Sequence, residues 1–456
     1  MIAPTTARVL AAIAATVLLG ACSTDDVLQV TDPDIINPTD VQSSAGATAV
    51  RNGALARLTA ATSGGGLTTA SANSEGLFLL SGLFADEWNN GDSFIARQEV
   101  DQRVITPANT FLTDVDRNLQ RARFSAAQAI TLLKQYNATG PAADVGEMYF
   151  VEAYVENIIG EHYCNGLVLG NLGDPEQYGT QTTTTAAFEM AVAHADSGLA
   201  LVTGTTTADV KIVNALRLVK GRALTNLNRQ AEAATAVSSV PTGFTYNIFH
   251  AQTTTDNEIW NYNNIQRRYS VSTGEGTNGL NFATAADPRI PVCQGGDARC
   301  TAAGVTLKSR DDGSAQPFYV QLIWPTRDAP VSIASGIEAH MIEAEAALKA
   351  GDAAGFMAKI NLPRTGVGAL ADPGSTTARQ DLLFRERAFW LFGRGYRVGD
   401  MRRLIKQYNR APTSVFPTGA WHKGGNYGGD VNFPVPQAEE NNPNVPSGQT
   451  CLDRNA

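Results

Sequence analysis

The sequence is poor in cysteine and histidine and has no strongly basic segment. Among 456 residues there are five Cys and five His, and the formal net charge is −9 at pH 7. Nucleic-acid binding requires a basic patch for the phosphate backbone, so this acidic balance argues against a nucleic-acid partner. The histidines are scattered and form no His-Glu-x-x-His motif, so the sequence predicts no metal site and no cofactor. They are His162, His194, His250, His340 and His422.

Signatures of common enzyme classes are also missing. Gly-x-Ser-x-Gly does not occur, and Gly393-x-Gly395-x-x-x-Gly399 does not have the dinucleotide-binding spacing. Asp114-x-Asp116-x-Asn118 begins like a calcium loop, but Leu119 stands where Gly is needed, which favours a solvated or N-capping turn. No carboxylate pair can be placed across a glycosidic bond, so a glycoside hydrolase is only a third hypothesis. We expect a protein that is not an enzyme.

Long hydrophobic runs are absent apart from one near the N-terminus. The apolar stretch Val9 to Leu19 follows Arg8 and is shorter than the roughly 20 residues that span a bilayer. It ends in Leu19-Gly20-Ala21-Cys22, whose small residues suit a signal peptidase site. We therefore expect residues 1–21 to be a lipoprotein signal peptide and Cys22 to carry the lipid, including palmitate. The alternative is a cleaved secretory signal that happens to end near a cysteine.

The four other cysteines indicate disulfides rather than a metal site. Cys164, Cys293, Cys300 and Cys451 allow three pairings and contain no Cys-x-x-Cys motif. The Gly-rich segment between Cys293 and Cys300 bends back easily, which favours that pair. Pairing of Cys164 with Cys451 is then possible, although their spacing does not support it. Export would provide the oxidising environment that disulfides need.

Helical periodicity dominates the chain after an acidic tether at residues 22–45. Apolar stripes predict helices at about 119–240 and 335–405, and the pair between Asp209 and Val240 approaches the 34-residue tetratricopeptide period. We expect a mostly α fold, in which tetratricopeptide-like helix pairs form a right-handed superhelical scaffold with long loop excursions and a few short strands. Within the excursions, Glu258 to Asn261 and Phe318 to Ile323 have the composition of short strands.

The excursions, at about 62–118 and 241–334, contain the candidate ligand contacts. Leu77 to Phe94 is predicted to be a loop, and it ends near an aromatic and amide cluster. Sugar rings present apolar faces flanked by hydroxyls, so a sugar site needs flat aromatic rings beside amides. The candidate contacts are Trp88, Asn89, Asn90, Trp260, Tyr262 and Trp324. The competing interpretation is that each Trp packs in the core.

The segment Arg385-Glu-Arg-Ala-Phe-Trp-Leu-Phe-Gly-Arg-Gly-Tyr-Arg-Val-Gly-Asp-Met-Arg-Arg-Leu404 resembles the C-terminal signature of the SusD/RagB family of nutrient-binding lipoproteins. Asp287-Pro288-Arg289 resembles the family's Asp-Pro-Arg turn, and Glu338 to Asp352 its late repeat helix. Phe433 to Asn444 is similar to its terminal motif. Arg394 departs from the pattern, because the family commonly has an acidic residue there. We interpret the Arg385–Leu404 signature as structural, with its charged side chains paired inside the scaffold.

The resemblance implies a single SusD-like domain at residues 46–456 and a role in nutrient uptake. Such a protein would be lipid-anchored at the outer membrane, facing the cell surface. It would capture glycans or other oligomeric nutrients and deliver them to a partner, a SusC-like TonB-dependent transporter barrel. The alternative is a tetratricopeptide-type envelope lipoprotein that serves as a scaffold for other proteins.

Overall fold

The computed structural model describes residues 41–65, 75–170, 178–448 and 451–454. The predicted signal peptide, Cys22 and residues 22–40 of the predicted tether lie outside these ranges. The first described helix, α2, begins at Ser44 and is N-capped by the Ser43 side chain. In the described part of the chain, no helix is both long and apolar enough to cross a membrane.

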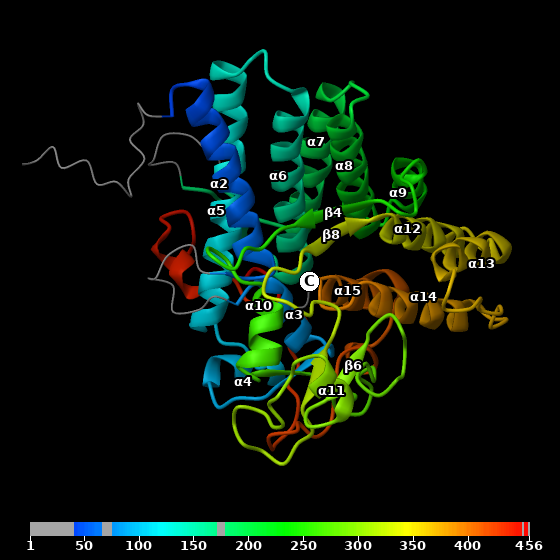
Figure 1. Cartoon of the computed structure of the whole chain (residues 1–456). Helices are drawn as coiled ribbons and strands as arrows, with labels where there is room; N and C mark the ends of the chain where they lie inside the picture. The colour runs from blue at the N-terminus through cyan, green and yellow to red at the C-terminus, as the bar shows by residue number, and fades with distance from the viewer. Residues whose placement is uncertain (1–40, 66–74, 171–177, 449–450, 455–456) are drawn as a thin grey trace, which may run out of the picture.

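Antiparallel helices packed side by side form the scaffold, which stands upright and then bends to the right in Figure 1. Helix α2 packs on α5, α6 on α7, α8 on α9, and α12 on α13. The expected mostly helical, tetratricopeptide-like fold is therefore confirmed. The scaffold helices are α2 (Ser44–Thr62), α5 (Thr110–Tyr136), α6 (Ala142–His162), α7 (Thr184–Leu201), α8 (Thr207–Asn226), α9 (Gln230–Val237), α12 (Gly336–Lys349), α13 (Ala353–Asn361), α14 (Thr376–Trp390) and α15 (Arg397–Tyr408).

Local sequence signals set the limits of these helices. Thr206 and Asp209 form a capping box at the start of α8, in which each side chain accepts from the other residue's backbone N–H. Asn109 caps α5 by accepting from the N–H groups of Phe111 and Leu112, both at 3.1 Å. Helix α6 is buried on nearly every side because it lies between α5, α7 and α8.

Most of the two excursions folds into a second lobe, which lies below the scaffold in Figure 1, whereas the pair β4–β8 at the ends of the second excursion lies against the scaffold helices. One is inserted between α2 and α5, and the other between α9 and α12. Antiparallel pairs β1–β5, β4–β8 and β6–β7 join distant parts of them, and a further pair, β2–β3 (Leu167–Val168 and Gln181–Thr182), lies outside the lobe. The excursions contain α3 (Leu77–Phe84), β1 (Trp88–Asn90), α4 (Ile95–Gln102), β4 (Thr245–Ile248), α10 (Glu258–Trp260), π-helix η1 (Asn261–Ile265), β5 (Tyr269–Val271), β6 (Val292–Gln294), α11 (Ala298–Ala302), β7 (Tyr319–Gln321) and β8 (Val331–Ser335).

Two local predictions in this lobe are wrong. Leu77 to Phe94 is not a loop, because it contains helix α3 and strand β1. Every residue of α3 is buried, so its sequence is apolar all round and lacks the periodic stripe by which a surface helix is recognised. Glu258 to Asn261 is helical rather than extended, and Asn257 caps it by accepting from the backbone N–H of Trp260. Strand β7 does lie within the predicted fragment Phe318 to Ile323.

Most of the Arg385–Leu404 signature is buried, and five of its charged side chains form ion pairs: Glu386, Arg387, Arg397, Asp400 and Arg403. Arg387 pairs with Asp400 at 2.8 Å, and Arg397 pairs with Asp86, next to α3, also at 2.8 Å. Arg394, the residue that departs from the family pattern, donates to the Trp390 carbonyl at 3.1 Å and lies over the Trp324 ring. The signature therefore joins the scaffold to the lobe.

Candidate functional site

Three of the four aromatic side chains predicted to contact ligand are buried. Trp88 is 0% exposed, Trp324 2% and Tyr262 5%, so none of them forms a surface on which a sugar could stack. Trp88 packs against Phe392 with ring centroids 5.0 Å apart. A Cβ added to Gly393 would lie 3.2 Å from the Trp324 ring and 3.4 Å from that of Trp88. The competing interpretation, core packing around the signature, is the correct one for both tryptophans.

The predicted amides lie in strand β1 and are buried as well. Asn89 pairs with Ser270 and Asn90 with Tyr269 in the β1–β5 ladder. The sixth predicted residue, Trp260, keeps part of its surface exposed at the junction of α10 and η1. The six residues therefore do not form the aromatic platform that the sequence analysis proposed.

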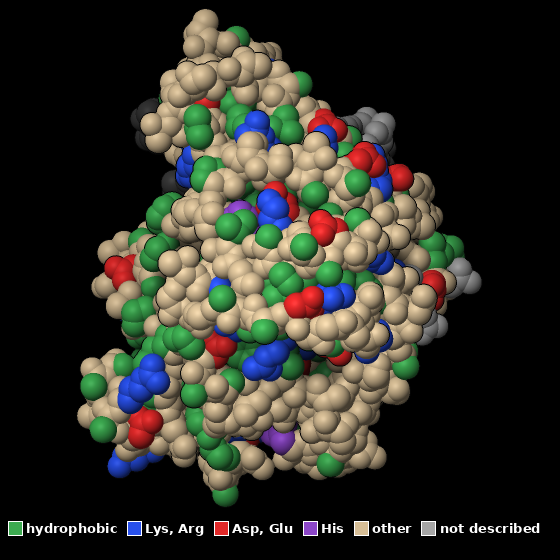
Figure 2. Space-filling view, turned by 90° about the vertical axis from the view of Figure 1, so that its right-hand side faces the viewer, with side chains coloured by type: hydrophobic (Ala, Val, Ile, Leu, Met, Phe, Trp, Pro, Cys, Tyr) green, Lys and Arg blue, Asp and Glu red, His purple; other side chains and the backbone are tan. Residues whose placement is uncertain are grey.

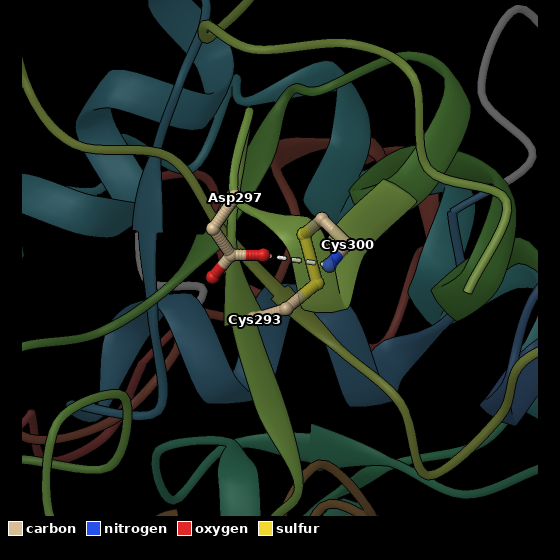
Figure 3. A group of neighbouring side chains, drawn as sticks. All are labelled: Cys293, Asp297 and Cys300. Atoms are coloured by element: carbon tan, nitrogen blue, oxygen red, sulfur yellow. Dashed lines mark hydrogen bonds between the residues drawn. A yellow bond between two sulfur atoms is a disulfide. The ribbon is translucent and has the colours of Figure 1, made fainter. Parts of the chain in front are cut away.

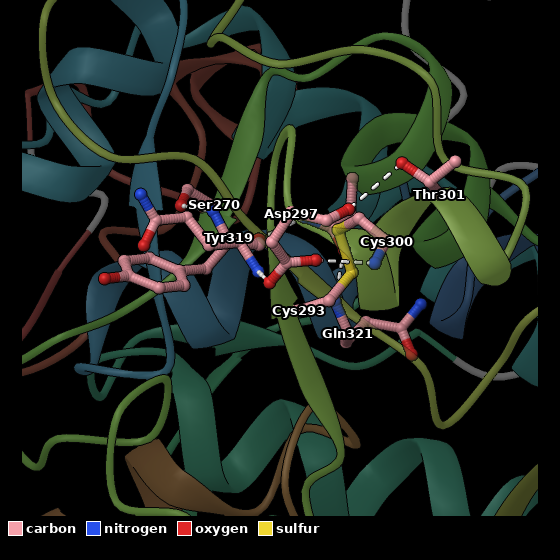
Figure 4. Close-up of a disulfide and its surroundings, with 9 residues drawn as sticks. Ser270, Cys293, Asp297, Cys300, Thr301, Tyr319 and Gln321 are labelled. Atoms are coloured by element: carbon pink, nitrogen blue, oxygen red, sulfur yellow. Dashed lines mark hydrogen bonds between the residues drawn. A yellow bond between two sulfur atoms is a disulfide. The ribbon is translucent and has the colours of Figure 1, made fainter.

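The four described cysteines form two disulfides. Cys293 is bonded to Cys300, and Cys164 to Cys451, with Cα atoms 5.2 and 5.9 Å apart. Asp297 caps the short helix α11 by accepting from the Cys300 N–H at 2.6 Å (Figure 3). The bond lies beside β7, where Tyr319 N–H donates to Ser270 at 2.9 Å (Figure 4). Cys293, Asp297 and Cys300 lie close enough to hold a metal ion, but the disulfide leaves no free thiolate to bind one.

A cleft of about 730 Å³ lies along α5 on the scaffold, away from the predicted residues. We call it the α5 cleft. In Figure 1, the red C-terminal segment that contributes to it lies beside α5. Its lining comes from four separate parts of the described chain: Arg57, Thr113, Asp116, Arg117, Gln120, Arg121, Arg123, Phe124, Ser125, Gln128, Val168, Gly170, Tyr178, Gly179, Pro436, Ala438, Glu439 and Asn442.

Two aromatic rings in the α5 cleft face solvent. Phe124 is 51% exposed and Tyr178 55%. Most other Phe side chains in the described part of the chain are buried. The loop carrying Tyr178 is held in place by the Asn442 amide, which donates to the Gly179 carbonyl at 3.0 Å. Gln128 is exposed one helical turn from Phe124 on the same face of α5. The cleft thus has the flat rings with neighbouring amides that a sugar-binding site needs.

The α5 cleft also contains cations without carboxylate partners. Within the described residues, neither Arg57 nor Arg121 forms an ion pair, whereas Arg117 pairs with Asp114 at 3.2 Å. Burial, together with the neighbouring Arg121, lowers the pKa of Arg57. These two guanidinium groups can donate hydrogen bonds to hydroxyl or carboxylate oxygens of a ligand.

Two carboxyl groups complete the electrostatics of the cleft. Burial raises the pKa of Asp116 to about 7, and the nearby Glu439 carboxylate adds to that rise. Glu439 also has a raised pKa because it is partly buried. Near neutral pH, Asp116 therefore carries a proton on part of the molecules and can donate as well as accept a hydrogen bond.

The α5 cleft was not predicted from the sequence, because its lining residues come from separate segments and form no recognisable motif within any one of them. Asp116, proposed to be in a solvated or capping turn, lies inside helix α5, and Asn109 is the cap. The one available signal was the apolar Phe124, which falls off the buried stripe of α5 and should therefore face outwards.

Comparison with known proteins identifies the architecture. No protein-family model and no curated protein matches the chain. Solved structures do match it. A SusD superfamily protein from Parabacteroides distasonis aligns with a TM-score of 0.64 at 12% identity, over 89% of this chain and 98% of that one. The chain has the SusD-like fold.

Two further SusD-like structures show the same correspondence. A SusD superfamily protein from Bacteroides fragilis gives a TM-score of 0.63 at 15% identity, over 89% of this chain and 99% of that one. A SusD-like carbohydrate-binding protein from Bacteroides fragilis gives 0.61 at 11% identity, over 88% and 98%. Nearly the full length of these proteins is matched, so the SusD-like fold here includes both the scaffold and the lobe.

Proposed function

We propose that this SusD-like protein is a non-enzymatic, lipid-anchored binding protein of the outer membrane. It captures glycans or other oligomeric nutrients at the cell surface and delivers them to a SusC-like TonB-dependent transporter. Its fold is similar to that of SusD-like carbohydrate-binding proteins of Bacteroides vulgatus and Bacteroides fragilis. The observation that carries the proposal is the α5 cleft, in which exposed aromatic rings lie beside amide and guanidinium donors.

The α5 cleft suits an oligosaccharide on chemical grounds. The C–H faces of sugar rings stack on Phe124 and Tyr178, while Arg57, Arg121 and Gln128 donate to ring hydroxyls. Because the two arginines form no ion pair in the described part of the chain, ligands with carboxylate groups, such as uronates, gain charge-assisted hydrogen bonds there. Neutral sugars accept hydrogen bonds from the same arginines through their hydroxyls, without that added charge interaction.

Anchoring rests on the lipidated Cys22. Each buried CH₂ group of an acyl chain contributes about 0.8 kcal/mol, and two or more chains hold a protein firmly at a membrane. The predicted tether at residues 22–45 then links the lipid to the scaffold, whose first described helix begins at Ser44.

Titration calorimetry with a panel of neutral and uronate-containing oligosaccharides tests the binding site. We expect the chain from residue 23 onwards to bind at least one panel member, and Phe124→Ala with Tyr178→Ala to weaken that binding at least tenfold (about 1.4 kcal/mol). Phe249→Ala is the matched control, because Phe249 is 67% exposed but lies outside the cleft. Binding that the double variant leaves unchanged would contradict the cleft assignment. Release of shortened sugars would contradict a non-enzymatic role.

Affinity purification of the lipidated full-length protein from mildly solubilised outer membranes tests the partner. We expect a large TonB-dependent barrel in stoichiometric amount, and loss of membrane association in Cys22→Ser. Recovery of soluble envelope proteins without a barrel would overturn the uptake role. It would favour the alternative, a tetratricopeptide-type scaffold lipoprotein.

A further inference from the structure

The fold brings together three potential metal ligands that are far apart in sequence and do not line the α5 cleft. Asp101 lies in the last turn of α4, Glu275 in the turn after β5, and His422 in the loop that follows α16 (Pro412–Val415). One ligand atom from each lies within 4.8 Å of the other two. Asp101 is 1% exposed and Glu275 3%, and the His422 side chain is 14% exposed. The sequence did not predict this cluster, because its three residues are widely separated in the chain and form no metal-binding motif.

The hydrogen bonds of His422 show which of its ring nitrogens faces the carboxylates. Nε2 lies 3.0 Å from the backbone carbonyl of Asn90, which can only accept, so Nε2 carries the proton. Nδ1 lies 3.6 Å from Asp101 Oδ2 and 3.7 Å from Glu275 Oε2. A neutral imidazole would therefore point its Nδ1 lone pair at two carboxylates, so either a proton on Nδ1 or a metal ion must lie between these groups.

The carboxylates are oriented by neighbouring donors, as metal ligands usually are. Trp421 Nε1 donates to Asp101 Oδ2 at 2.9 Å, and Ser272 donates to Glu275 Oε1 at 3.1 Å. The Tyr427 hydroxyl donates to Glu275 Oε2. These contacts, together with the Asn90 carbonyl on His422, hold all three ligands in place from outside.

Two buried oxygens at this cluster lack hydrogen-bond partners among the described residues. They are Asp101 Oδ1 and Asn89 Oδ1. Asn89 is 5% exposed, and its side chain hydrogen-bonds to Glu275, so this amide is a neighbour of the cluster. Buried polar atoms are nearly always satisfied, and each exception calls for an explanation. A bound cation would provide one, because carboxylate and amide oxygens are metal ligands.

We propose that Asp101, Glu275 and His422 bind one divalent transition-metal ion, Zn²⁺ or Mn²⁺. Metal–ligand bonds of about 2.1 Å at tetrahedral angles place ligand atoms roughly 3.4 Å apart, so the two His422 contacts at 3.6 and 3.7 Å need to contract by only a few tenths of an ångström. The two carboxylate oxygens lie within 4.8 Å of each other. An imidazole with carboxylates suits zinc and manganese better than calcium or magnesium. The ion joins α4, the β5 turn and the loop at His422, and so fastens the two excursions to the C-terminal region.

Metal binding to the whole chain tests this inference without any glycan. After chelation and dialysis, we expect the protein to bind one Mn²⁺ per chain at pH 7.5, measured as loss of the free Mn²⁺ resonance signal, and Zn²⁺ to compete. Saturating metal should raise the unfolding temperature by about 3 °C or more. Absence of a stoichiometric ion and of any thermal shift would overturn the proposal and leave a protonated His422 as the cation of the cluster.

Variants locate the ion. His422→Gln and Glu275→Gln should each weaken Mn²⁺ binding at least tenfold, whereas His194→Gln should not, because His194 pairs with Glu156 on the scaffold. Equal binding by His422→Gln and the wild type would exclude this site. If these variants fail to fold, fluorescence of the wild-type protein still tests the position of the ion. Bound Mn²⁺ must then quench Trp421 fluorescence, and Trp421→Phe must lose that quenching.

Discussion

Arg289 and Glu386 form a buried ion pair at 2.7 Å, although they lie 97 residues apart in the chain. Arg364 reaches the same carboxylate at 2.5 Å, and Asp287 pairs with Arg289 at 2.7 Å. The pair therefore ties the Asp-Pro-Arg turn of the lobe to helix α14. The Asp-Pro-Arg turn and the Arg385–Leu404 signature, two motifs that resemble those of SusD proteins, therefore contact each other through this ion pair.

Removing the Glu386 carboxylate should destabilise the protein strongly. Glu386→Ala removes the carboxylate that the Arg289 and Arg364 guanidinium groups share. We expect this loss to lower the free energy of unfolding by about 3–5 kcal/mol. Urea denaturation measures the loss. Glu232→Ala removes an exposed partner of Arg229 and should change nothing measurable. Similar midpoints for the two variants would show that the Arg289 contact does not stabilise the fold.

The two disulfides should differ in their effect on stability. Cys164 and Cys451 are separated by 287 residues, and Cys293 and Cys300 by 7. Closing the longer loop removes more entropy from the unfolded chain, which amounts to about 3 kcal/mol in the chain-entropy account. Replacing both members of the first pair with Ser should therefore lower the calorimetric unfolding temperature more than the same change in the second. The reverse order would contradict this.

The buried Glu87 should make stability depend on pH. Burial raises its pKa from 4.5 to about 8, although the Gly393 N–H donates to it. The folded state thus holds the proton more tightly than the unfolded state. The stability due to this group is full below about pH 4.5 and is lost as the pH rises through 8.

Glu87→Gln should remove that loss. At pH 9 we expect the variant to exceed the wild type by up to about 4 kcal/mol, and at pH 4 to equal it. Thermal unfolding across this pH range measures the difference. Some dependence will remain, because burial also raises the pKa of Glu338 to about 7. Parallel curves for the two proteins would show that Glu87 is ionised in the folded state at neutral pH.

Gly393 should not tolerate a side chain. Its φ is +67°, and an added Cβ would press on the Trp324 and Trp88 rings. Gly393→Ala should cost about 2–4 kcal/mol, from backbone strain together with overpacking. Gly368→Ala is the matched control, because Gly368 also has a positive φ, of +86°, but has open space around it. Equal losses by urea denaturation would mean that the tryptophan rings move aside easily.

The helical scaffold could be predicted because its helices are amphipathic and capped locally. The stripe Ile212, Ala215, Leu216, Val219 and Ala223 is buried in α8 as its spacing indicated. The same reasoning failed for α3, which is buried all round. Periodicity reports a difference between two faces, so a helix without that difference gives no signal.

The candidate site could not be predicted for a different reason. Tryptophan next to asparagine was the predicted signature of a sugar site, but Trp88 and Trp324 are buried around Gly393. The α5 cleft instead combines residues from α2, α5, the segment near Tyr178 and the C-terminal region, which only the fold brings together. On the face drawn in Figure 2, acidic and basic side chains are interspersed and apolar ones are scattered, so no broad patch there indicates a second site.

The first helix pair of the scaffold, α2 with α5, is interrupted by the insertion of residues 63–109. While the chain emerges from the ribosome or the export channel, α2 appears well before the helix that covers its buried stripe. Helices α6 to α8 follow one another without such an interruption, and contacts between near neighbours form fastest. Folding should therefore begin in the middle of the scaffold, and α2 should dock late.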